Sequence, residues 1–206
     1  MRHFKLQALI LILFFLCLVQ KAWAIEPRQA LEGGLNQVLD LIKSPAYADP
    51  KTRSAQREKI AVIVKQNFDF YEFSLRTVGP KWRQFTPAQQ KDFSEAFGDL
   101  LINTYVNKID GYNGEQISYA GERSGKDRTE IMTVVAMKGG KKIPVAYRKL
   151  PKDGTWKVYD VLVEGISLVK NYRSQFQDIL NSSTPEQLIE RIRSKANEAK
   201  TSHAKS

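Results

Sequence analysis

The middle of the chain most limits the fold, because its apolar residues follow the two-residue period of a β-strand. Four alternating stretches begin near residues 117, 128, 143 and 156. Turn signals at Gly139-Gly140 and Asp153-Gly154 separate the last three by only a few residues. Connections this short join antiparallel neighbours and leave no room for a crossover helix. The segment therefore predicts a meander of four antiparallel strands.

Helical periodicity replaces the alternation on both sides of this segment. Residues 27–42 carry apolar side chains on one helical face as far as Ser44-Pro45, and Asp49-Pro50 predicts the start of the next helix. Two capping boxes, at 86–89 and 184–187, predict further helix starts. Helices before and after an antiparallel sheet indicate an α+β fold. We predict a curved four-stranded sheet with one face covered by helices.

Residues 1–24 predict a cleavable secretion signal. A basic start with Arg2, His3 and Lys5 precedes an apolar run over 6–19, and Ala22-Trp23-Ala24 supplies small residues at the two positions that signal peptidase reads. The run is shorter than the ~20 apolar residues of a membrane span, so a retained anchor is the weaker alternative. We expect cleavage after Ala24 and a location in the periplasm.

The exported part is long enough for one domain with its own core. We predict a single domain over 25–195 and a flexible polar tail over 196–206, because apolar periodicity stops near Lys195. The signal holds three of the 32 basic residues and none of the 22 acidic ones, so the exported net charge is +7. This excess aids solubility or favours an anionic partner, such as a membrane surface or an acidic protein. Export argues against nucleic acid.

Cysteine and histidine are nearly absent from the exported part. Cys17 and His3 lie in the signal, which leaves only His203, in the polar tail. The exported chain therefore has no disulfide, no thiol nucleophile and no Cys/His metal site. It also lacks the usual general base for a serine nucleophile. We expect no catalytic residue, no metal and no cofactor.

Asp160 and Glu164 are the acid/base pair that the sequence leaves for an enzyme. Alternation along the last strand places both on one face. Four residues of strand separate them by roughly 13 Å, which exceeds the ~5–9 Å between the carboxyl groups of a glycosidase. An enzyme built on these carboxylates stays an alternative. The structural interpretation is that Asp160 accepts hydrogen bonds from a turn and that Glu164 begins the next helix.

Aromatic residues recur along the predicted helices, and periodicity gives them two interpretations. They form a core by packing on one another, or some of them line a cavity for an apolar ligand beneath the curved sheet. Both arrangements bury the same faces, so the period alone does not separate them. The residues concerned are Phe68, Phe70, Phe73, Phe93, Phe97, Tyr105, Tyr172 and Phe176.

The stretch 156–176, WKVYDVLVEGISLVKNYRSQF, resembles the signature of the MlaC family. These are periplasmic phospholipid-binding proteins, also called toluene-tolerance auxiliary proteins of an ABC transporter. The resemblance covers about residues 27–195. Upstream motifs that agree with it are Phe68-Asp69-Phe70, Gly79-Pro80-Lys81-Trp82 and Thr86-Pro87-Ala88-Gln89-Gln90.

The resemblance implies a soluble shuttle. Members of the family carry phospholipid between an outer-membrane lipoprotein–porin complex and an inner-membrane ABC transporter complex with a lipid-binding ring subunit, which maintains outer-membrane lipid asymmetry. Their fold is a nuclear-transport-factor-like cone with added N- and C-terminal helices, and the acyl chains lie between sheet and helices. The resemblance thus implies phospholipid as the cargo, and we expect the protein to be a monomer. A ligand-free envelope module that binds other proteins stays the alternative.

Periodicity within this expected fold suggests which side chains form an apolar wall around the lipid. The helix-covered sheet face would contribute Ile131, Val135, Val145, Tyr147 and Val158. The helices would contribute Phe73, Leu101, Tyr105, Ile166, Val169 and Tyr172. Arg173 could reach a lipid phosphate, although an exposed helix arginine is the simpler interpretation.

Overall fold

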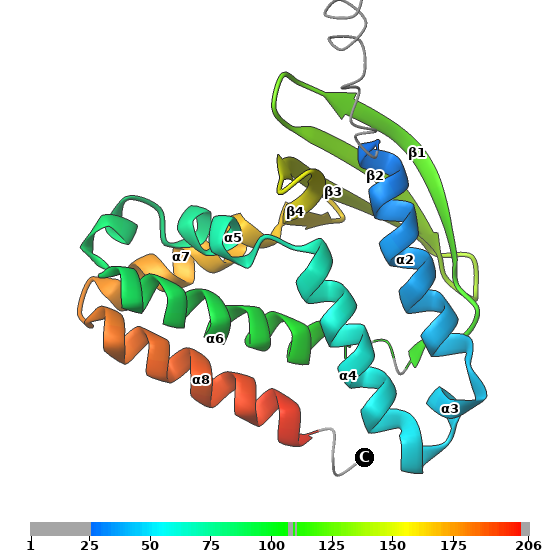
Figure 1. Ribbon diagram of the computed structural model, residues 1–206, viewed down its shortest axis with the longest axis horizontal. Coiled ribbons are helices and arrows are strands. Elements are labelled where there is room, and N and C mark those ends of the chain that lie inside the picture. The colour runs from blue at the N-terminus through cyan, green and yellow to red at the C-terminus, as the bar shows by residue number, and fades with distance from the viewer. Residues whose placement is uncertain (1–25, 107–108, 110, 203–206) are drawn as a thin grey trace, which may run out of the picture.

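The computed structural model describes residues 26–106, 109 and 111–202, so the predicted signal lies outside it. The helices are α2 (Pro27–Lys43), α3 (Pro45–Ala48), α4 (Pro50–Asn67), α5 (Phe70–Val78), the 3₁₀ helix η1 (Gly79–Gln84), α6 (Pro87–Val106), α7 (Leu168–Leu180) and α8 (Pro185–Ser202). The strands are β1 (Gln116–Ser124), β2 (Thr129–Ala136), β3 (Lys142–Lys152), β4 (Thr155–Val163) and β5 (Ile166–Ser167). This order confirms the predicted α+β class (Figure 1).

The strands form one antiparallel sheet in chain order, from β1 to β5. The predicted four-stranded meander is present, but the sheet has a short fifth strand where we predicted the start of a helix. Glu164 and Gly165 have φ angles of 51° and 82°, and the tight turn that they make brings Ile166 back beside Val163. Two residues are too few to show an alternating period, so the pattern did not reveal this strand.

Local side-chain signals start the helices where the sequence predicted. The carboxylate of Asp49 accepts a hydrogen bond of 2.9 Å from the backbone N–H of Lys51 at the start of α4. Thr86 and Gln89 exchange the two hydrogen bonds of a capping box at the start of α6, and the second box does the same for α8. These caps satisfy backbone donors that the first turn of a helix leaves unpaired.

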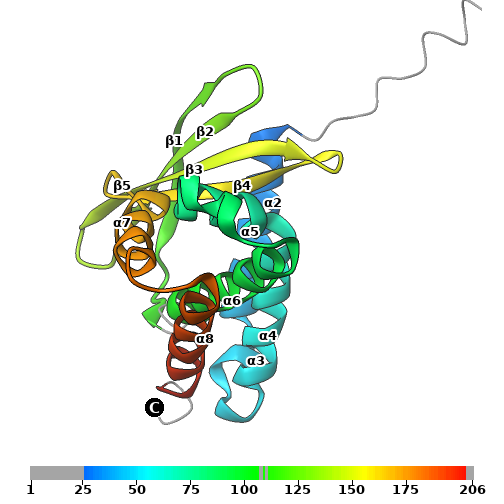
Figure 2. The ribbon, with the colours of Figure 1, turned by 90° about the vertical axis from the view of Figure 1, so that its left-hand side faces the viewer.

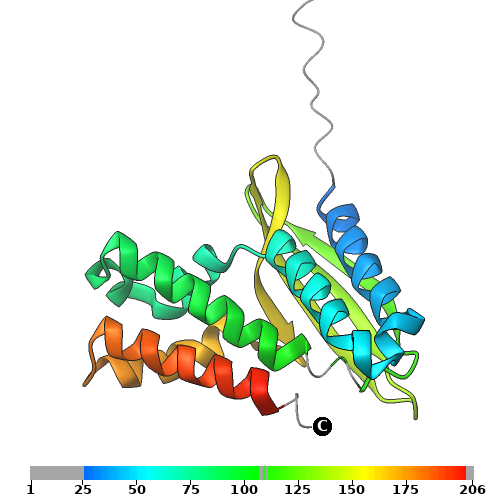
Figure 3. The same ribbon diagram turned by 60° about the horizontal axis from the view of Figure 1, so that its bottom comes forward.

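The helices lie on one side of the sheet, which Figure 2 shows with the sheet above them. Their buried side chains form two clusters. The larger one joins α5, η1, α6, α7 and α8 and is centred on aromatic rings such as Phe93 and Phe97. The smaller one joins α3, α4 and α6, with α2 packed against it. Figure 3 shows α2 and α4 beside the sheet and α6 beside α8.

The C-terminal end differs from the prediction of a polar tail from residue 196. Helix α8 continues to Ser202, and Ala196 is buried in the larger cluster. The amide of Asn103 also donates a hydrogen bond of 3.0 Å to the carbonyl of Ala196. A single buried alanine does not produce a visible apolar period, so the sequence did not indicate that the helix continues past residue 195. Within residues 26–202 as described, no helix has the length and apolar character needed to cross a membrane.

Candidate functional site

The strand register places all five predicted sheet residues on the face that the helices cover. Ile131 lies opposite Tyr147, and Val158 lies opposite Lys149 two positions further along β3. Val135 and Val145 share the face by alternation along β2 and β3. Helices α2 and α4 contact β4 on this side, and α2 also contacts β2.

Burial along this face is uneven. Ile131 and Val158 have 0% and 1% of their surface exposed, whereas Val135, Val145 and Tyr147 are only half-buried. The exposed part of Tyr147 is not its hydroxyl group: burial of that group raises the pKa of Tyr147 to about 12, because it disfavours the phenolate. The helices thus seal one end of the apolar face and leave the other end partly open.

The sealed end is fixed by the first turns of α2. The ammonium group of Lys149, which is 1% exposed, donates a hydrogen bond of 2.9 Å to the backbone carbonyl of Pro27. The guanidinium of Arg28 lies 4.6 Å from the ring centre of Tyr119 on β1. Burial lowers the pKa of Lys149 to about 8, since the charged form loses its hydration. These contacts and the buried Leu31 hold the start of α2 on the sheet.

The open end contains an apolar groove with a volume of about 280 Å³ between the second half of α2 and the sheet. Small-molecule sites usually have volumes of roughly 300–1,000 Å³, so the groove has room for part of an apolar ligand without any movement. Its lining residues are Leu35, Val38, Leu39, Ile42, Ile109, Gly111, Tyr112, Glu115, Ile117, Val135 and Met137.

Val135 is the predicted wall residue that lines this groove. The prediction missed the other ten lining residues, of which four come from α2 and six from residues 109–117 and the end of β2. The signal was present in the sequence, because Leu35, Val38, Leu39 and Ile42 follow one helical face. Whether protein covers such a stripe depends on how α2 is tilted over the sheet, and periodicity does not contain that information.

The predicted helix residues mostly belong to the larger helical cluster. Phe73, Leu101 and Val169 are buried in it, and Tyr105 and Tyr172 pack against it half-buried. The ring of Phe73 lies 5.7 Å from that of Phe97, edge to face. These side chains contact other protein side chains, which favours the core interpretation for them.

Tyr105 and Tyr172 share a side-chain hydrogen bond. Burial raises the pKa of Tyr172 to about 12, so both hydroxyl groups stay neutral at physiological pH. Ile166, by contrast, is 65% exposed beside the end of β4. It therefore lies at the rim of the apolar face instead of inside it.

The two carboxylates considered for catalysis have structural partners. Asp160 is buried and accepts hydrogen bonds from Arg148 (3.2 Å), from the hydroxyl of Ser167 (2.7 Å) and from the backbone N–H of Val169 (3.1 Å). Glu164 is exposed in the turn before β5 and lies 3.5 Å from the ammonium group of Lys141. Asp160 thus has a structural role as predicted, but its donors lie on β3, on β5 and at the start of α7 instead of in a turn. Glu164 precedes β5 and does not begin a helix.

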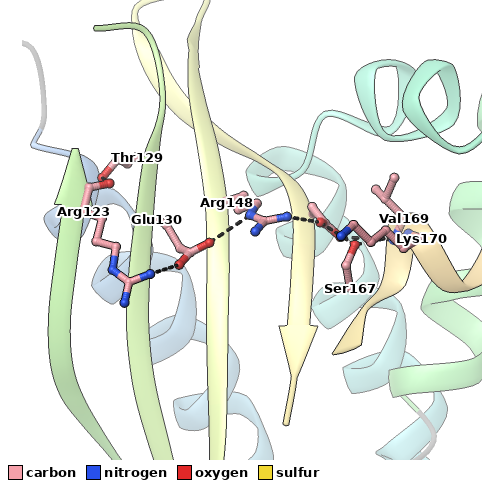
Figure 4. A network of polar contacts seen from close by, with 8 residues as sticks. Arg123, Thr129, Glu130, Arg148, Ser167, Val169 and Lys170 are labelled. Carbon is pink, nitrogen blue, oxygen red and sulfur yellow. Dashed lines mark hydrogen bonds and ion pairs between the residues drawn. The ribbon is translucent and has the colours of Figure 1, made fainter. Parts of the chain in front are cut away.

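Figure 4 shows a row of polar contacts across the other face of the sheet, from Arg123 through Glu130 to Arg148. The carboxylate of Asp160 ends this row. Arg123 lies 3.7 Å from Glu130, and Glu130 accepts a hydrogen bond of 2.8 Å from Arg148, which reaches Asp160. The row ties four strands, β1 to β4, to the first turn of α7. Within the described part of the chain, no group of three or more His, Cys, Asp or Glu residues could hold a metal ion.

Arg173 is half-buried, not exposed as the simpler interpretation expected. Its guanidinium donates to the backbone carbonyl of Arg76 with two nitrogens, one of them at 2.9 Å. That carbonyl lies in the last turn of α5, so Arg173 joins α7 to α5 through a charged donor at a helix C-terminus.

Comparisons with known proteins agree with the fold. A solved structure of a phospholipid-binding protein from Ralstonia solanacearum, in complex with a phospholipid, superposes with a TM-score of 0.72 at 24% sequence identity. The match covers 84% of this chain and 98% of that protein. At this identity the likeness shows a shared fold.

Sequence relatives extend the comparison. The toluene tolerance protein ttg2D of Pseudomonas putida is 32% identical over 157 residues, which are 75% of this chain and 73% of that protein. The intermembrane phospholipid transport system binding protein MlaC of Haemophilus influenzae is 24% identical over 128 residues, 60% of each chain, so the match spans less than two thirds of that relative.

The sequence model of the MlaC protein family matches residues 33–194. This range includes the second half of α2, the whole sheet and most of α8, and therefore both walls of the groove. The signature over 156–176 contains Asp160, Ser167 and Val169, the residues that attach α7 to the sheet. On this match the chain belongs to the MlaC family.

Proposed function

We propose that this protein is a periplasmic phospholipid carrier that holds acyl chains between the apolar sheet face and α2. The groove beside Val135 carries the proposal, because it is lined by apolar side chains from both elements and is open. The half-buried Ile143, opposite Val135, and Val145 lie on the same sheet face next to the groove. Apolar walls of this kind replace the contact with water that costs ~0.8 kcal/mol for each methylene of a free lipid chain.

A carrier needs no chemical step, and we propose that the protein is not an enzyme and has no cofactor besides its lipid cargo. Asp160 supports this, since three hydrogen bonds already occupy its carboxylate. The named relatives support phospholipid as the cargo, by the words in the names of the Haemophilus and Ralstonia proteins. We further propose that the protein exchanges lipid with an inner-membrane Mla-type transporter and an outer-membrane lipoprotein–porin complex, and so maintains lipid asymmetry.

The test is organic extraction of protein purified after export, followed by mass spectrometry of the extract. We expect phospholipid in a fixed ratio to protein. Leu39→Trp should reduce that ratio by filling the groove, whereas Val62→Trp, at an exposed position on α4, should not. An extract without phospholipid would favour the ligand-free interaction module, and equal lipid in both variants would place the lipid elsewhere.

Transfer and partners need separate measurements. Labelled phospholipid should move between two vesicle populations faster when the protein is added, and Leu39→Trp should slow that movement. Cross-linking in intact cells should join the protein to components of both membrane complexes. If the protein binds lipid but exchanges it with neither complex, the lipid-binding part of the proposal holds and the shuttle function is wrong.

A further inference from the structure

The β2–β3 and β4–β5 turns lie together at one end of the sheet. The backbone N–H of Glu164 donates a hydrogen bond of 2.9 Å to the carbonyl of Pro144, which joins the second turn to β3. Lys141 in the first turn lies 3.5 Å from the carboxylate of Glu164. Met137, which precedes the first turn, lines the apolar groove. The two turns are therefore next to each other at the open end of the candidate site.

Three exposed lysines lie at this end, and we call them the basic rim: Lys138, Lys141 and Lys142. Glu164 offsets one of these charges. That ion pair is exposed on both sides, with 66% and 52% of the two side chains accessible, and such pairs contribute little to stability. Long lysine side chains of this kind reach a charged surface while their carbon stems lie along apolar neighbours.

Ile166 lies beside the basic rim and is 65% exposed, the largest exposed fraction among the large apolar residues described. It pairs with Val163 of β4, and Val163 pairs with Val145 of β3. Val145 and Ile143 alternate along the same face, and Ile143 lies opposite Val135 in the groove. A continuous row of apolar side chains thus leads from an exposed isoleucine to the groove.

We propose that this end of the sheet docks on an anionic phospholipid bilayer, with the basic rim at the head groups and Ile166 in the interface. An exposed apolar side chain between flexible cations matches the boundary between acyl chains and charged head groups. Docking in this orientation places the apolar row against the bilayer, where an acyl chain can pass from lipid to groove. This purpose rests on the proposed carrier function, but the binding itself does not.

Cosedimentation with vesicles tests the docking. Wild-type protein should bind phosphatidylglycerol/phosphatidylethanolamine vesicles more tightly than phosphatidylcholine vesicles, and salt should weaken the difference. Each lysine near an anionic surface changes binding about fivefold, so replacing Lys138, Lys141 and Lys142 by Ala should weaken it about a hundredfold. Ile166→Asn should weaken it about fivefold through the lost apolar insertion.

Matched controls separate the surface from general charge and hydrophobicity. Replacing the exposed lysines Lys51, Lys59 and Lys195 by Ala removes the same charge from helices α4 and α8 and should change vesicle binding far less. Val62→Asn changes another exposed apolar residue and is the control for Ile166→Asn. Equal losses in test and control variants would overturn the proposal, as would equal binding of anionic and neutral vesicles by the wild type.

The lipid content of the same variants distinguishes the two proposals. We expect the basic-rim and Ile166 variants to keep their extracted phospholipid and to transfer it more slowly between anionic vesicles. Normal docking with no lipid in the extract would reject the carrier function and leave the docking intact. Normal lipid content with no preference for anionic vesicles would reject the docking and leave the carrier function intact.

Discussion

Asp160→Asn tests whether the buried carboxylate is a structural anchor. Asparagine has nearly the same shape, but it replaces one carboxylate oxygen by an amide group that donates. In the wild type one oxygen accepts from Arg148 and Ser167, and the other accepts from the backbone N–H of Val169. The variant can therefore satisfy only part of this set.

The size of the effect follows from these partners. Hydrogen bonds to a charged group contribute about 1.5–3 kcal/mol each when buried. The contact with Arg148 deserves a lower value, because 34% of that side chain is exposed to solvent. We expect Asp160→Asn to lower the free energy of unfolding by about 3 kcal/mol, which for a domain of this size corresponds to a Tm lower by about 6–12 °C.

Urea unfolding followed by circular dichroism measures this change. The control is Asp92→Asn, because Asp92 lies 3.2 Å from Arg193 but both side chains are about half exposed, at 49% and 48%. Exposed pairs contribute under about 1 kcal/mol, so this variant should stay close to the wild type. If both variants lose the same stability, the anchoring role is wrong. If Asp160→Asn stays folded and loaded with lipid but abolishes function, the enzyme alternative returns.

Three further predictions concern the groove, the buried lysine and the aromatic cluster. Val145→Trp should lower the amount of co-purified phospholipid, because Val145 lies half-buried on the apolar face. Circular dichroism should show an unchanged fold. An unchanged lipid content would mean that Val145 is not part of the apolar wall around the lipid. Lys149 has a pKa of about 8 in the folded protein against an ordinary value of 10.5, so the unfolded chain binds more protons between these pH values. The unfolding free energy of the wild type should therefore rise relative to that of Lys149→Met between pH 8 and pH 10.5. The rise should reach about 3 kcal/mol, because each pKa unit corresponds to ~1.4 kcal/mol. Parallel pH profiles of the two proteins in urea titrations would contradict this. Phe97→Ala should lower the free energy of unfolding by about 3–5 kcal/mol, because the fully buried ring of Phe97 contacts four other aromatic rings. Tyr71→Ala, at an exposed position, is the control. A smaller loss of stability for Phe97→Ala than for this control would argue against tight packing.

Regular elements with strong local signals could be predicted well. The capping boxes at Thr86 and Thr184 start helices because a hydroxyl and a carboxamide within four residues satisfy free backbone donors. Alternation in β2 and β3 placed Ile131 and Tyr147 on one face, because side chains of a strand point to opposite sides in turn. Both signals act within a few residues, so no knowledge of distant contacts is needed.

Features that depend on distant contacts were missed or misread. Strand β5 forms because Ile166 pairs with Val163 across a tight turn. Helix α8 continues past residue 196 because Ala196 packs in the larger cluster. The helix residues Phe73 and Leu101 fit a ligand wall and a packed core equally well by period. Only the positions of the neighbouring helices show that they contact protein.

The sequence by itself determined the helix–sheet–helix order, the faces of the strands, and the scarcity of groups for acid/base or thiol chemistry. Its motif over 156–176 also indicated the family. The tertiary structure decided that Asp160 anchors α7, that Lys149 holds the start of α2, and that the apolar face is open near Val135. The reason is physical: local periods fix which side of an element is apolar, but the tilt between packed elements decides whether protein fills the space beside it.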